Sequence, residues 1–181
     1  MPKNANILLI RHAEKTGDIT DFGLSIAGQE RAMAYTVYFQ NFTIEGSPLQ
    51  LNYLFASHQS AHSNRPFLTI QPLATQLHLK IDDHFQANTD PEHGLPGLIH
   101  YLQTDTHFDN FNILVCWHHE QLLELATSLG ALPHTLPVNW PDTVFGWVIY
   151  LSYDAKGVVT RSGVIEENLM FDDYGQPPVV Q

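Results

Sequence analysis

Short apolar runs alternate with segments of helical periodicity along the chain. The apolar runs fall at residues 7–10, 51–56, 111–117, 144–151 and 158–165, and apolar side chains recur every three or four residues within 25–39, 67–77 and 122–129. Short apolar runs indicate buried strands, and the wider spacing indicates one face of a helix. Alternating strands and helices predict an α/β protein with a mostly parallel sheet and helices on both faces, which makes three layers. Turn residues at 154–157 predict that the last two strands form an antiparallel pair.

Length and composition restrict the possible classes of protein. The 181 residues suit one domain over 1–181, with the acidic, proline-bearing segment 166–181 as a peripheral tail. With 19 acidic and 8 basic residues, the formal charge of −11 disfavours binding to nucleic acid or to an anionic membrane. No apolar stretch approaches the roughly 20 residues of a membrane span. A single cysteine and the lack of a secretory leader predict a cytoplasmic location. The sequence leaves the oligomeric state open.

A charged cluster directly follows the first apolar run. Arg11, His12 and Glu14 stand where the first strand should end. Open α/β sheets bind ligands at the carboxyl ends of their strands, so this position predicts a binding site. The chain has only four arginines (Arg11, Arg31, Arg65 and Arg161), and a phosphate site in an acidic protein must concentrate such cations.

Arg65 is a second candidate for binding an anion. It directly precedes Pro66, and proline is favoured at the first position of a helix. Arg65 is therefore expected at a helix N-terminus, where free backbone N–H groups already attract anions. We expect Lys15 and Arg31 to be ordinary surface charges.

Three ordered motifs resemble those of the histidine phosphatase superfamily, also called phosphoglycerate mutase-like. They are Arg11-His12-Ala13-Glu14, close to the usual Arg-His-Gly-Glu; the series Ser57, Arg65 and Thr69 after the second strand; and His118-His119-Glu120 after the apolar strand that ends near Trp117. The resemblance covers residues 7–130 and implies a small, single-domain member with the phosphoglycerate mutase-like fold.

The resemblance implies a phosphatase that hydrolyses a phosphate monoester through a phosphohistidine intermediate on His12. It also implies that Arg11 and Arg65 bind the phosphate, and that one histidine of the adjacent pair is catalytic. We favour His119 for that role, with His118 as a phosphate ligand, although the alternative alignment selects His118. The implied chemistry uses no metal or other cofactor. The substrate would be a phosphorylated small molecule or a phosphoprotein.

The proton donor is less well defined by the motifs. Glu120 is the leading candidate, because a carboxylate directly after the second histidine is similar to the acid phosphatase branch. Glu92, Asp82 and Asp83 are the alternatives, and Glu14 is expected to be an orienting hydrogen-bond partner. A non-catalytic phosphate- or phosphoprotein-binding protein of the same fold is the alternative function. A mutase is less favoured, because the chain is short for the insertions that enclose a retained phosphoenzyme.

Overall fold

A six-stranded sheet forms the centre of the protein. In the computed structural model, which describes residues 1–18, 20–174 and 178–180, its strands lie in the order β5-β4-β6-β1-β7-β8. They are β1 (Asn6–Arg11), β4 (Tyr53–Ala56), β5 (Ile81–Asp82), β6 (Asn112–Trp117), β7 (Trp147–Tyr153) and β8 (Val159–Glu166). β5, β4, β6 and β1 run parallel, whereas β7 pairs antiparallel with both β1 and β8. The predicted α/β class and the antiparallel pair at the end of the chain are therefore confirmed.

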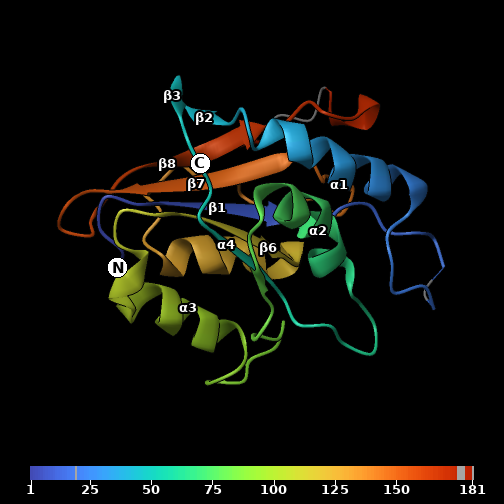
Figure 1. The fold of residues 1–181 in the computed structure, drawn as a ribbon, viewed down its shortest axis with the longest axis horizontal. Coiled ribbons are helices and arrows are strands. Elements are labelled where there is room, and N and C mark those ends of the chain that lie inside the picture. Colours follow the sequence, from blue (N-terminus) through green and yellow to red (C-terminus); the bar gives the residue numbers. More distant parts are fainter. Residues whose placement is uncertain (19, 175–177, 181) are drawn as a thin grey trace.

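Helices cover both faces of this sheet (Figure 1). They are α1 (Ile26–Tyr38), α2 (Arg65–Leu77), α3 (Leu95–Thr104) and α4 (His119–Ser128). Because successive side chains of a strand point to opposite faces, Leu8 and Ile10 pack with the α1 and α2 side, and Ile7 and Leu9 pack with the α3 and α4 side. The two cores confirm the three-layer arrangement.

The start of α1 lies directly against the segment that follows β1. Ser25 caps the helix, and its Oγ accepts a hydrogen bond of 3.0 Å from the Gly28 backbone N–H. A Cβ at Gly28 would lie 2.3 Å from the Glu14 carbonyl oxygen. Glycine at this position therefore allows α1 to approach the residues that follow His12.

Several short elements cannot be predicted from patterns in the sequence. β2 (Thr43–Ile44) and β3 (Ser47–Pro48) form a two-stranded hairpin, and β5 has only two residues, too few to show a period. The polar stretch 84–94, which contains Pro91, forms the loop before α3, which begins at Leu95. The strand expected at 144–151 begins at Trp147. The preceding backbone carbonyls of Pro141, Asp142 and Val144 accept hydrogen bonds from Arg11 instead of from a neighbouring strand.

The expectation for Arg31 is wrong. Its side chain is 1% exposed, forms ion pairs with Glu14 and Asp173, and donates a hydrogen bond of 2.9 Å to Glu167. The last two lie in the segment 166–181, which the sequence predicts to be peripheral; Glu167 is buried, and Asp173 ends a short 3₁₀ helix, Phe171–Asp173. Three partners so distant in sequence cannot be recognised from a local pattern.

No helix in the described part of the chain is long and apolar enough to cross a membrane. The cytoplasmic location and the single-domain organisation stay predictions.

Candidate active site

Three neighbouring parallel strands end at the same edge of the sheet. Arg11 at the end of β1 is in register with Trp117 at the end of β6, and Ala56 at the end of β4 is in register with Cys116. The His12 backbone N–H still donates to the Trp117 carbonyl at 3.0 Å. The residues that follow each strand, His12, His118 and Ser57, are therefore brought together by strand register.

Arg11 is completely buried and held by the loop 141–146. Its Nη1 donates to the backbone carbonyls of Asp142 at 2.7 Å and Val144 at 2.8 Å, and more weakly to Pro141 at 3.3 Å. The Phe145 ring stacks on the guanidinium, 3.9 Å from Cζ to the ring centroid. Burial lowers the pKa of Arg11 to about 10, so the group is still cationic at neutral pH.

Two donors of Arg11 remain unused. Its Nε and Nη2 are buried and have no hydrogen-bond partner in the protein. Buried donors are normally paired, and an unpaired cationic donor costs more than a neutral one. A planar guanidinium with two free donors matches the oxygens of a phosphate group.

His12 is buried and neutral. Its Nδ1 lies 2.8 Å from the Ala13 carbonyl oxygen, and a carbonyl can only accept, so Nδ1 carries the proton and Nε2 keeps a lone pair. Burial lowers the pKa of His12 to about 3, with further lowering from the positive charges of Arg11 and Arg65. In this tautomer and protonation state, Nε2 of His12 is able to act as a nucleophile.

His118 faces His12 across the site. The two ring centroids are 5.3 Å apart, in an edge-to-face arrangement. His118 Nε2 forms a hydrogen bond of 3.0 Å with the Ser57 hydroxyl, which fixes the orientation of the ring. Burial lowers the pKa of His118 to about 4.

Arg65 begins α2, as its position before Pro66 predicts. Two backbone carbonyls hold its guanidinium: Nε donates to the Gly23 carbonyl at 3.0 Å, and Nη2 donates to the Asp21 carbonyl at 2.5 Å. Thr69, one turn along, accepts a hydrogen bond of 2.8 Å from the Ala13 N–H. Thr69 thereby ties α2 to the segment that carries His12.

His119 occupies a different position from His118. Its Nε2 lies 2.8 Å from an Asp142 carboxylate oxygen, in a hydrogen bond that lowers the pKa of Asp142. Its Nδ1 is 3.2 Å from a Glu120 oxygen, close enough for an ion pair but without the geometry of a hydrogen bond. Glu120 itself is 68% exposed at its side chain. His119 is thus flanked by two carboxylates, while His118 contacts His12 and Ser57.

A cavity of about 780 Å³ opens over this region. His118, Arg65 and Glu120 line it, together with Gln121 and residues of the segments 58–63 and 86–88, whereas Arg11 and His12 do not. Glu92 is not among its lining residues, and Asp82 and Asp83 line a separate cavity of about 400 Å³. Of the four candidate acids, Glu120 alone borders the cavity. No group of three or more His, Cys, Asp or Glu side chains within the described ranges could hold a metal ion.

The structure brings most of the residues in the sequence motifs close together, but the groups that support them are not predicted by those motifs. The carbonyls that hold Arg11 come from a loop about 130 positions away, and backbone groups carry no sequence signal. The partner of Glu14 is Arg31, which donates to both its oxygens. Glu14 is therefore hydrogen-bonded, but to a residue that the sequence predicts to be exposed.

No protein-family model matches the sequence, and no curated protein matches it. Solved structures match its fold. A mycobacterial glucosyl-3-phosphoglycerate phosphatase has a TM-score of 0.55 at 14% identity, with 91% of this chain and 99% of that chain covered. The protein histidine phosphatase SixA, solved with tungstate, has a TM-score of 0.53 at 15% identity, with 90% and 97% covered.

Phosphoglycerate mutase from Plasmodium falciparum is similar over 97% of this chain and 95% of its own, with a TM-score of 0.51 at 12% identity. At identities this low, structural similarity establishes the fold alone, and the reaction has to be inferred from the site. The protein has the phosphoglycerate mutase-like fold that these members of the histidine phosphatase superfamily share.

Proposed function

We propose that the protein is a phosphatase that hydrolyses a phosphate monoester through phosphohistidine on His12. The observation that carries this proposal is the buried Arg11 guanidinium, with Nε and Nη2 unpaired, beside a neutral His12. A dianionic phosphate repels a nucleophile until cations neutralise its oxygens. Arg11 and Arg65 supply those cations, and the neutral Nε2 of His12 supplies the lone pair.

The reaction has two balanced steps. The Nε2 lone pair of His12 forms the N–P bond as the bond from phosphorus to the ester oxygen breaks, and the leaving alkoxide takes a proton from Glu120. Water then attacks phosphorus, gives its proton to Glu120, and the N–P bond breaks to release phosphate. Glu120 is proposed as the acid because it borders the cavity with His118 and Arg65.

We propose His118, rather than the His119 favoured by the motif alone, as the second catalytic histidine. Its ring lies 5.3 Å from that of His12. A bound phosphate dianion would raise its pKa, and the protonated imidazole would then donate to the phosphate oxygens in the transition state. His119 would act through Asp142, on the loop that holds Arg11.

The cavity also favours a particular class of leaving group. Beyond Arg65, its lining has no arginine or lysine and no phenylalanine, tyrosine or tryptophan; it consists largely of histidine, glutamine, asparagine and serine, with Glu120 as the carboxylate. Such a surface hydrogen-bonds to an uncharged polar group and repels a second anion. We propose a phosphorylated small molecule whose leaving alcohol is polar and carries no negative charge.

The test is chemical trapping of the intermediate. Purified protein should release phosphate from an aryl phosphate without added metal and with a chelator present. Rapid quenching at alkaline pH, where phosphohistidine survives, should recover phosphate on a peptide containing His12. Phosphate release with the label on another residue would exclude this mechanism.

Exposure of Glu120 favours one alternative function. A solvent-facing acid is a weak proton donor for a buried leaving group, so a non-catalytic phosphate-binding protein is the second candidate. Tungstate or phosphate binding without any turnover of an activated aryl ester would favour it.

A further inference from the structure

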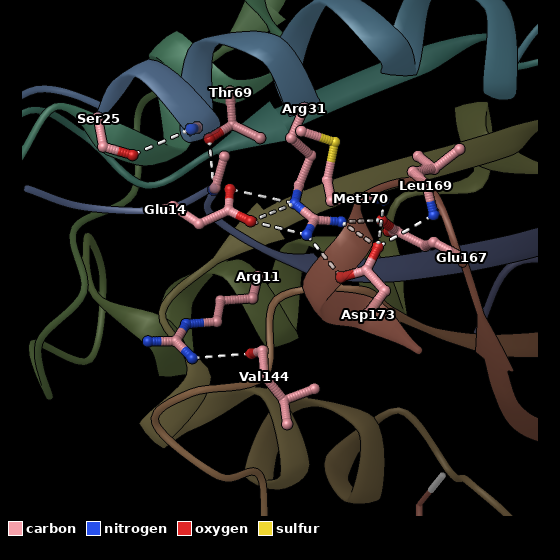
Figure 2. Close-up of polar contacts among 12 residues, drawn as sticks. Arg11, Glu14, Ser25, Arg31, Thr69, Val144, Glu167, Leu169, Met170 and Asp173 are labelled. Atoms are coloured by element: carbon pink, nitrogen blue, oxygen red, sulfur yellow. Dashed lines mark hydrogen bonds and ion pairs between the residues drawn. The ribbon is translucent and has the colours of Figure 1, made fainter. Parts of the chain in front are cut away.

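A buried ionic cluster lies behind the active site. Its centre is Arg31, whose guanidinium donates hydrogen bonds to the acidic side chains of Glu14, Glu167 and Asp173; these four residues are called the Arg31 cluster (Figure 2). Asp173 forms two parallel hydrogen bonds to the guanidinium, at 2.6 Å and 3.0 Å. The Tyr35 hydroxyl donates to Glu167 at 2.9 Å. None of the four residues lines the large cavity.

One side of the Arg31 cluster supports the segment that carries His12. Arg31 Nη2 and Nε donate to Glu14 Oε1 at 2.7 Å and 3.0 Å. Glu14 is two residues beyond His12, and its carbonyl accepts the Ser25 N–H at the start of α1 at 2.9 Å. The position of the Glu14 side chain therefore constrains the backbone just after the nucleophile.

The other side of the Arg31 cluster supports the loop 141–146. A Cβ at Gly146 would lie 2.5 Å from the Asp173 carboxylate, so the two groups are in close contact. The Glu167 N–H also donates to the Gly146 carbonyl at 2.8 Å. Gly146 follows Phe145, whose ring stacks on Arg11.

Backbone hydrogen bonds hold the Asp173 carboxylate in this position. Its Oδ2 accepts hydrogen bonds of 3.0 Å from the backbone N–H groups of Leu169 and Met170, which fold the C-terminal segment around it. Burial opposes ionisation of Asp173, but hydrogen bonds from Arg31 outweigh it and lower its pKa. The carboxylate is therefore charged at neutral pH and paired with Arg31.

We propose that Asp173, acting through Arg31 and Gly146, is a positioning residue that sets Arg11 against His12. This inference rests on the proposed phosphatase function. The chain of contacts runs from His12 through Glu14, Arg31 and Asp173 to the loop that grips Arg11. The C-terminal segment thus fixes the segment that carries His12 relative to the loop 141–146, without touching the substrate. Small displacements of such groups reduce turnover strongly.

The experiment compares Asp173→Asn with Glu45→Gln. The first keeps the shape of the side chain and removes its charge, whereas the second removes an exposed ion pair between Glu45 and Arg161. We expect Asp173→Asn to lower kcat by about 10- to 100-fold and to weaken tungstate binding by about 10-fold, in protein that circular dichroism shows to be folded. Glu45→Gln should change both by less than about twofold.

A second variant tests the contact with Gly146 without removing a charge. Gly146→Ala places a methyl group against the Asp173 carboxylate and should reduce kcat as Asp173→Asn does. In an Asp173→Gly background there is room for that methyl group, so Gly146→Ala should have no further effect. Full additivity of the two substitutions would contradict the proposed route.

A third measurement separates this inference from the proposed function. In ligand-free protein, Asp173→Asn should shift the imidazole NMR signals of His12 and the amide signals of residues 141–146, whereas Glu45→Gln should not. If wild-type protein neither turns over esters nor binds tungstate, the phosphatase proposal fails, and these shifts still decide the positioning role. Unchanged His12 signals in Asp173→Asn would overturn it.

Discussion

The rings of His12 and His118 meet edge to face with their centroids 5.3 Å apart, and both are neutral because burial lowers their pKa values. One ring has its Nδ1–H fixed by the Ala13 carbonyl, and the other is oriented by the Ser57 hydroxyl. This arrangement leaves an unprotonated Nε2 on His12 and a second neutral imidazole that can take up a proton when an anion binds.

The adjacent histidines should differ sharply in their effect on turnover. His118→Asn removes the group that faces His12 and should lower kcat by about 10²- to 10³-fold, as loss of one transition-state donor does. His119→Asn loses only the contacts with exposed carboxylates and should cost less than about 10-fold. Steady-state kinetics on one aryl phosphate measures both. The reverse order would restore His119 to the catalytic role.

Oxyanion binding should be accompanied by proton uptake. At pH 6 the free His118 is neutral because its pKa is about 4. A bound dianion raises that pKa, so the complex takes up a proton, and affinity for tungstate should fall as pH rises above 6. Titration calorimetry in buffers of different ionisation enthalpy counts the protons. His118→Asn should take up about one proton fewer than wild type, and equal uptake by both would exclude His118 as the site.

Glu120 should matter only for poor leaving groups. Glu120→Gln should lower kcat by about 100-fold for an alkyl phosphate and by less than about threefold for 4-nitrophenyl phosphate, because nitrophenolate departs without a proton. Glu92→Gln is the matched control and should affect neither substrate. A leaving-group contrast in Glu92→Gln alone would assign the acid to the loop that precedes α3.

A carboxylate on the leaving group should reduce activity. Wild-type protein should show a higher kcat/KM for glycerol 3-phosphate than for 3-phosphoglycerate, whose leaving group is anionic. Ala61 is exposed and lines the cavity, so Ala61→Lys adds a cation there. This variant should reduce the ratio of kcat/KM for glycerol 3-phosphate to kcat/KM for 3-phosphoglycerate by roughly 10-fold. Val158→Lys makes the same change of net charge at an exposed position outside the cavity and should leave the ratio unchanged. Equal narrowing by both variants would point to net charge instead of the cavity lining.

Stability should decrease with rising pH through Glu167. Burial raises its pKa to about 8, against about 4.3 for an unfolded glutamate. Between these values the folded protein keeps a proton that the unfolded chain has lost, so the free energy of unfolding falls as pH rises, by at most about 1.4 kcal/mol per pH unit. Glu167→Gln lacks this dependence. Urea unfolding at pH 5, 6.5 and 8 should show wild type losing stability relative to the variant, and parallel curves would contradict the assignment.

Local sequence determined where the strands and helices that carry the candidate site residues begin and end. The apolar run before Arg11 makes a buried strand, and a strand in a parallel sheet delivers the next residue, His12, to the binding edge. Pro66 likewise marks the start of α2 and so the position of Arg65. These features depend on neighbours within a few residues, which a sequence pattern can record.

Tertiary structure alone decided which way the side chains face and what holds them. His118 and His119 are adjacent in sequence, yet one is turned toward His12 and the other toward Asp142, because α4 begins between them and rotates successive side chains apart. Arg31 has the sequence context of a surface helix residue, but it is buried, and acidic side chains from three distant positions pair with it there. Burial and charge pairing depend on contacts across the whole chain, so local sequence cannot specify them.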